Sequence, residues 1–160
     1  AMNENKKLTA GVYIPDENRL LYTLDEWRQR KDPTTADGVV LVMDFYGHLA
    51  AIKIAKHDIK RRLDFYNAQA TAAALGAGRR PFSVHEGVEL YRAKHLHGLN
   101  DALRAVGGDA MTECSYWTCD SDTDPDYPRC AFVVGMYNGN VCFNFKTSNN
   151  CVRAVSAFPL

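Results

Sequence analysis

Residues 130–145 read CAFVVGMYNGNVCFNF, and this stretch decides the fold of the C-terminal half. Residues 131–134 and 140–143 are short runs of β-branched and aromatic residues, which are typical of strands. Asn138-Gly139 lies between them, and Asn-Gly is the strongest short-range signal for a β-hairpin. We therefore expect two antiparallel strands joined by a two-residue turn.

Outward from this hairpin, residues 116–118 and 152–155 are further strand candidates. Residues 120–128 contain four Asp and two Pro, which predicts a surface loop. Towards the N-terminus, turn residues separate short apolar runs that we also expect to be strands. These runs are residues 11–14, 19–22, 38–43 and 49–54.

Two helices are expected between these groups of strands, over residues 63–75 and 84–106. Ser83 with Glu86 forms a capping box for the second helix, and Gly98 is a point at which that helix can break. Thr23 with Glu26 is a second capping box, which opens a short helical turn. The order of elements predicts one α+β domain, residues 1–160, with two helices packed on small antiparallel sheets.

Composition narrows the function classes. The 160 residues are 46% hydrophobic and 24% charged, as in an ordinary globular domain. No apolar run approaches the ~20 residues that span a bilayer, and residues 1–7 lack the apolar stretch of a secretory signal. The 19 basic and 19 acidic residues cancel, which argues against a general nucleic-acid binder. We expect neither nucleic acid as a partner nor membrane insertion.

The acidic loop raises the question of a cation site. Asp120, Asp122 and Asp124 follow the 1-3-5 spacing of an EF-hand loop. However, Pro125 stands where that loop requires glycine, and Ala131 stands where it requires a bidentate glutamate. The pattern argues against an EF-hand, and it leaves a looser cation site open beside a simple solvated loop.

The cysteines lie late in the chain, at Cys114, Cys119, Cys130, Cys142 and Cys151. Their spacing is not that of a known zinc finger. Every histidine precedes residue 98, so a nucleophilic cysteine would need a histidine base that only folding could bring near it. Free thiols and one or two incidental disulfides both remain open. We expect no catalytic residue, metal or cofactor.

The basic residues of segment 53–62 surround Asp58 and are typical of a solvated charged face; a basic groove for an anionic partner is the alternative. His85, His95 and His97 lie on the second predicted helix, where we expect them to face solvent.

Residues 127–151 combine Tyr and Phe with Asn and Ser, a composition that binding surfaces use because rigid rings lie beside adaptable hydrogen-bonding groups. In a strand over residues 141–145, Cys142 and Asn144 share one face, and Phe143 and Phe145 share the other. Both faces cannot be core. The alternative is that Phe132 and Phe143 are simply interior residues.

Several motifs follow one another through the C-terminal half: GGDA at 107–110, YWT at 116–118, AFVV at 131–134, NGNV at 138–141, KT at 146–147 and VRAVSAF at 152–158. This order resembles the variable proteins of diversity-generating retroelements, in the C-type-lectin-fold group found in gut Bacteroides and their phages. That group is related to the formylglycine-generating-enzyme fold. The resemblance is strongest over residues 79–160, and residues 21–23 and 26–27 resemble the opening of such domains.

In that family a reverse transcriptase mutates template adenines, so Asn codons change to any residue encoded by NNC. Between residues 119 and 151 only Met136 and Lys146 fall outside this set. The resemblance implies a C-type-lectin-like binding module, not an enzyme, with a variable region over residues 114–151. It also implies that the cysteines are random draws with no shared chemical role.

The resemblance implies a set of diversified ligand-facing residues: Tyr127, Arg129, Phe132, Tyr137, Asn140, Cys142, Phe143, Asn144, Phe145, Ser148, Asn149, Asn150 and Cys151. It implies that Trp117, Val133, Gly139, Val141, Lys146, Val152 and Arg153 are invariant scaffold. The ligand would be a protein or glycan on a cell surface, and the chain itself would be displayed on a virion or a cell.

Two other functions stay open from the sequence. One is an oxidase of the formylglycine-generating type, which would use a metal and a cysteine pair. The other is a structural domain of a virion or pilus that binds no ligand.

Overall fold

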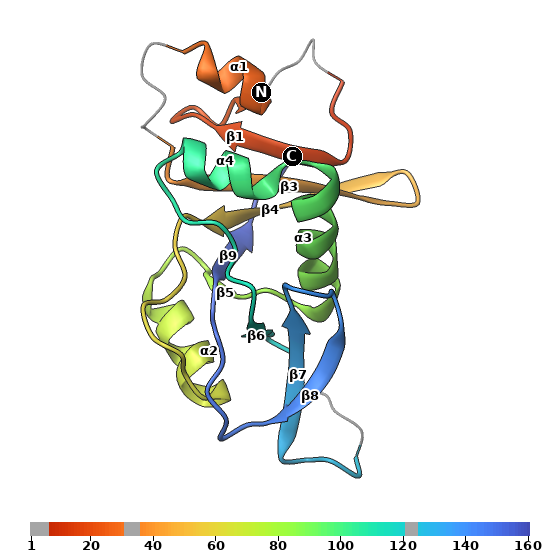
Figure 1. Cartoon of the computed structure of the whole chain (residues 1–160). Coiled ribbons are helices and arrows are strands. Elements are labelled where there is room, and N and C mark those ends of the chain that lie inside the picture. The colour runs from red at the N-terminus through yellow and green to blue at the C-terminus, as the bar shows by residue number, and fades with distance from the viewer. Residues whose placement is uncertain (1–6, 31–35, 121–124) are drawn as a thin grey trace.

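The computed structural model describes residues 7–30, 36–120 and 125–160. This part of the chain forms four helices and two antiparallel sheets, which confirms the predicted α+β class. In Figure 1 the larger sheet lies in the upper half and the smaller sheet in the lower half, with helix α3 (Val84–Leu96) running between their levels. No helix in the described part is both long and apolar enough to cross a bilayer.

The larger sheet has six strands in the order β2-β1-β3-β4-β9-β5. Their bounds are Gly11–Pro15 for β1, Leu21–Tyr22 for β2, Gly38–Phe45 for β3, His48–Ala55 for β4, Arg80–Pro81 for β5 and Ala154–Ala157 for β9. The last strand begins two residues later than predicted. Val152 and Arg153 are fully buried, and the Val152 carbonyl accepts a hydrogen bond from the Ile59 N–H.

Three further helices lie close to the positions that the sequence predicts. They are α1 (Leu24–Arg28), α2 (Phe65–Ala74) and α4 (Leu99–Ala105). Thr23 with Glu26 and Ser83 with Glu86 both form complete capping boxes, at the starts of α1 and α3. Gly98, with φ +64°, separates α3 from α4, so the predicted second helix does break there.

The smaller sheet has the order β6-β7-β8, with bounds Ser115–Trp117, Cys130–Gly135 and Val141–Phe145. The predicted hairpin is confirmed, and Phe132 lies opposite Phe143. The predicted two-residue turn is wrong. The Gly135 N–H donates to the Asn140 carbonyl, which leaves residues 136–139 as the connection, and the Asn138 side chain accepts from the Asn140 N–H.

Gly139 is required in this connection for two reasons. Its φ is +74°, and a Cβ on it would lie 2.6 Å from the ring of Tyr91. We expect Gly139→Ala to lower the free energy of unfolding by about 3 kcal/mol, from left-handed backbone strain and overpacking together. Gly47→Ala is the matched control, because Gly47 has φ +90° but no neighbour within 4 Å; it should cost about 1 kcal/mol. Equal losses in urea denaturation would contradict the role of Tyr91.

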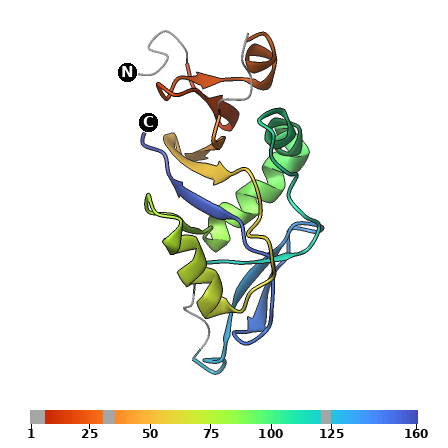
Figure 2. The same ribbon diagram turned by 90° about the vertical axis from the view of Figure 1, so that its left-hand side faces the viewer.

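Three apolar clusters lie in the described part of the chain, and two of them join the sheets to helices. The larger one packs the sheet against α3 and α4 and reaches Tyr116 and Val134 of the smaller sheet. The smaller one joins Phe65 of α2 to Trp117 and Val133. Figure 2 shows α2 on the opposite side of β9 from α3. One face of the smaller sheet is therefore buried against α2.

Arg153 is fully buried where these layers meet. Its Nε lies 2.6 Å from Asp58 Oδ1, and the Tyr116 hydroxyl lies 2.7 Å from Asp58 Oδ2. Burial, together with the charge of Asp58, raises the pKa of Tyr116, so this hydroxyl stays a donor. The Arg153 guanidinium donates further to the carbonyls of Ala55, Lys56, Asp109 and Ala110. One side chain thereby ties the loop after β4 to the loop before β6.

Candidate ligand-binding surface

A group of aromatic rings, most of them exposed, lies on the β7–β8 hairpin and in the segment just before it. We call Tyr127, Phe132, Phe143 and Phe145 the aromatic face. The rings of Phe132 and Phe143 lie 4.8 Å apart, and Tyr127 stacks on Phe143 with centroids 6.1 Å apart. Phe145 is 63% exposed, Tyr127 55% and Phe143 44%. Apolar rings exposed side by side are unusual on a monomer surface and mark binding sites.

The position of the hairpin explains why these rings stay outside. Strand β8 is at the edge of its sheet. Ala131 and Val133 of β7 point into the cluster with α2, so the opposite side of β7 carries Phe132. Further along that side, Val134 is covered by α3, where it approaches Gly87. The open part of this side is therefore confined to the end of the hairpin that is far from α3.

The structure separates the predicted ligand-facing residues into three groups. Phe132, Asn144 and Ser148 are half-buried. Asn150 and Cys151 are buried. The remaining residues are exposed: Tyr127, Arg129, Tyr137, Asn140, Cys142, Phe143, Phe145 and Asn149. Phe143 is therefore not an interior residue, and neither face of β8 is core.

The prediction that Asn150 and Cys151 face solvent is wrong. The N–H and C=O groups of Asn150 pair with Leu63, and its side-chain oxygen accepts from the Asn144 amide at 3.1 Å. Cys151 bonds through its backbone to Ser115 and Trp117. Both residues thus follow the hairpin back into the interior, where substitution is restricted by packing.

The prediction that the cysteines share no chemical role is also wrong for one pair. Cys114 and Cys151 form a disulfide across a sequence separation of 37 residues. Cys119, Cys130 and Cys142 are free thiols. Burial, together with the charge of Asp120, raises the pKa of the Cys119 thiol. This shift is opposite to the one that a nucleophilic cysteine needs.

Most residues that the resemblance assigns to the scaffold are interior. Trp117, Val133, Val152 and Arg153 are buried. The Lys146 ammonium lies 5.5 Å from the ring centre of Phe65, a cation–π contact that holds the chain after β8 against α2. Val141 departs from its assignment, because it is 40% exposed on the same side of β8 as Phe143 and Phe145. The alternation of β8 was the signal that could have placed it there.

Where the structure describes them, the other candidate groups make contacts outside the aromatic face. Asp120 accepts a hydrogen bond from the Val84 N–H at the start of α3, and Asp122 and Asp124 lie outside the described residues. His85, His95 and His97 are exposed, as predicted. Among the described residues, no group of three or more His, Cys, Asp and Glu side chains is placed to hold a metal ion.

The chain matches no protein-family model, and no curated protein sequence matches it either.

Proposed function

We propose that this chain is a binding module that presents the aromatic face and its polar surroundings to a ligand, and that retroelement mutagenesis diversifies this surface. The observation that carries the proposal is the exposure of Tyr127, Phe143 and Phe145 beside strand β7, whose other side packs into the core. Rigid rings of this kind provide contact area at a low cost in conformational entropy. The ligand is a protein or a glycan on a cell surface.

Diversification needs positions that can change while the fold stays intact. Surface substitutions usually alter stability by no more than about 0.5 kcal/mol, whereas core substitutions cost several times as much. Asn140, Asn149 and Phe145 are exposed and satisfy this condition. Asn150 and Cys151 do not satisfy it, so we restrict the proposed variable surface to the exposed and half-buried residues of the predicted set.

Stability measurements test the separation of surface from scaffold. We expect the double substitution Phe143→Ser with Phe145→Ser, and the triple substitution of Asn140, Asn144 and Asn149 by Ala, each to shift the melting temperature by less than about 4 °C. Val133→Ser, which opens a buried site on the same hairpin, should lower it by more than about 6 °C. A comparable loss in the surface variants would contradict the proposal.

Binding and genomic context test the function itself. Labelled wild-type chain is expected to bind some members of a glycan array or of a panel of intact bacteria, and the same surface variants should lose that binding while they remain folded. The neighbouring DNA should carry a reverse-transcriptase gene and a near-copy of the 3′ end of this reading frame. Isolates that differ evenly along the chain, and not at exposed residues between 127 and 149, would favour a structural domain without a ligand.

A further inference from the structure

A hollow of about 750 Å³ opens between α2, the end of β4 and the start of β9. Ala55, Ile59, Leu75 and Ala154 give it an apolar lining. Its volume is within the range of small-molecule sites, about 300–1,000 Å³. None of its lining residues belongs to the aromatic face or to the predicted ligand-facing set, so it is a separate site.

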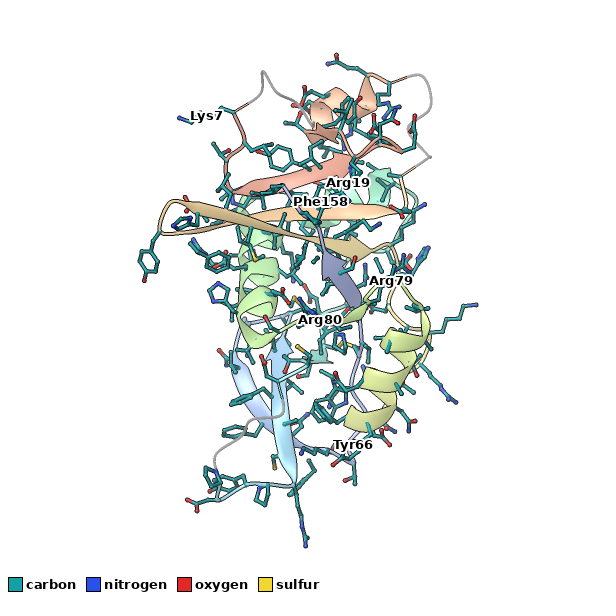
Figure 3. The ribbon with its side chains drawn as sticks, turned by 180° about the vertical axis from the view of Figure 1, so that it is seen from behind. Lys7, Arg19, Tyr66, Arg79, Arg80 and Phe158 are labelled. Carbon is teal, nitrogen blue, oxygen red and sulfur yellow. A yellow bond between two sulfur atoms is a disulfide. The ribbon has the colours of Figure 1, made fainter. Side chains whose placement is uncertain are left out.

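Four cations surround this lining: Lys56, Lys60, Arg61 and Arg79. Over residues 7–30, 36–120 and 125–160, none of them has a carboxylate within salt-bridge distance. Figure 3 shows Arg79 beside the start of β5, above α2.

The two acidic residues of the hollow are already engaged by cations outside its lining. Asp37 pairs with Lys53 at 3.0 Å, and Asp58 pairs with Arg153 at 2.6 Å. The hollow therefore combines an apolar interior with an uncompensated positive rim, which favours an anion.

The segment that carries Lys56, Lys60 and Arg61 is held in place without a ligand. The Lys56 carbonyl accepts from the Asp109 N–H at 2.8 Å and from Arg153 at 3.0 Å. Gly108 makes this approach possible, because a Cβ at that position would lie 2.5 Å from the Lys56 carbonyl oxygen. The Ile59 N–H donates to Val152 at 2.9 Å. Such a preformed wall reduces the ordering cost of binding.

We propose that this hollow binds a free amphipathic anion, meaning a phosphate, sulfate or carboxylate group attached to an apolar body of moderate size. The apolar body occupies the space over Ala55, Leu75 and Ala154, and the anionic group lies among Lys56, Lys60 and Arg79. The volume of the hollow, about 750 Å³, fits one small molecule, and we therefore assign the ligand to a soluble molecule and not to a membrane surface.

Isothermal titration calorimetry with three probes tests whether binding requires both the anionic group and the apolar body. Decyl phosphate below its micelle concentration carries both parts, inorganic phosphate carries only the anion, and decanol carries only the apolar body. We expect decyl phosphate to bind saturably at one molecule per chain, at least tenfold more tightly than either other probe. Equal affinity for phosphate, equal affinity for decanol, or no saturable binding of decyl phosphate would each overturn the proposal.

Two variants locate the binding. Thr71 lines the hollow from α2, so Thr71→Trp should fill it and abolish binding of decyl phosphate. Lys60→Ala with Arg79→Ala should weaken binding at least tenfold. Arg92→Ala with Arg104→Ala removes the same charge from exposed helix positions and should leave affinity within twofold. Circular dichroism confirms that each variant is folded, and equal affinity in all variants would place the ligand elsewhere and overturn the proposal.

Co-sedimentation with vesicles tests whether the anion is a free molecule or a lipid headgroup in a membrane. We expect the chain to stay in the supernatant with phosphatidylglycerol vesicles. Co-sedimentation that is lost in the Lys60 and Arg79 variant would overturn the assignment to a free molecule. The proposal does not depend on the aromatic face, because the surface variants at Phe143 and Phe145 leave every residue of the hollow unchanged.

Discussion

Replacing Arg153 with methionine is expected to lower the free energy of unfolding by about 3–5 kcal/mol, the cost of breaking a buried ion pair from one side. The guanidinium is fully buried and pairs with Asp58 at 2.6 Å. Without it, the partners of that carboxylate within the described residues are the hydroxyls of Tyr116 and Thr112, and four backbone carbonyls lose a donor. For a chain of this size the loss corresponds to about 10–15 °C in melting temperature.

Two further variants make this expectation specific. Arg104→Met removes an exposed arginine that pairs with Asp101 at 3.2 Å, and it should cost no more than about 0.5 kcal/mol. Asp58→Asn with Arg153→Met should be more stable than Arg153→Met alone, because it removes the half-buried charge that Arg153 neutralises in the parent chain. Guanidinium denaturation measures all of these losses. If Arg153→Met and Arg104→Met had equal effects, Arg153 would not be the link between the two loops.

Removal of the Cys114–Cys151 disulfide is the second large effect. A cross-link that closes a loop of 37 residues stabilises a protein by about 4 kcal/mol in the chain-entropy treatment. We therefore expect the double variant Cys114→Ala with Cys151→Ala to melt about 10 °C below the parent chain. Reduction of the parent chain should lower its melting temperature by a similar amount.

The free thiols provide the control for that experiment. Cys142 is exposed and unpaired, so Cys142→Ala should leave the melting temperature nearly unchanged. Reductant should have no effect on the double variant, since its remaining cysteines are the free thiols Cys119, Cys130 and Cys142. An unchanged melting temperature in the double variant would show that the disulfide does not constrain the unfolded chain as the loop length requires.

Most predictions that depend on residues close in the sequence were confirmed, whereas features that depend on distant contacts were not predicted. Local signals were reliable: both capping boxes formed, Gly98 divided α3 from α4, and the hairpin around Asn138 paired as expected. Each of these features depends on residues that are close in the sequence. The predicted two-residue turn was wrong: the connection spans residues 136–139, and its Gly139 lies against Tyr91 of α3, a contact that no local pattern contains.

Within the candidate site, the composition of residues 127–149 indicated a binding surface, but it did not reveal which rings are open. Phe132 and Phe143 look equivalent in the sequence, yet Phe132 is half-buried and Phe143 is 44% exposed. Val141 looked like scaffold and is exposed, whereas Asn150 looked exposed and is buried. Contacts that form only in the folded chain decide these differences: Asn150 pairs with Leu63, and Val141 and Phe143 lie on the edge strand β8.

The amino-acid sequence by itself determined the class of the fold, the order of its helices and strands, and the region rich in Tyr, Phe and Asn. Tertiary structure alone decided that Cys114 pairs with Cys151, that Arg153 pairs with Asp58, and that four cations surround an apolar hollow. The reason is physical. Caps, turns and strand alternation arise from backbone geometry over a few residues, whereas burial and pairing depend on segments that meet only after the chain has folded.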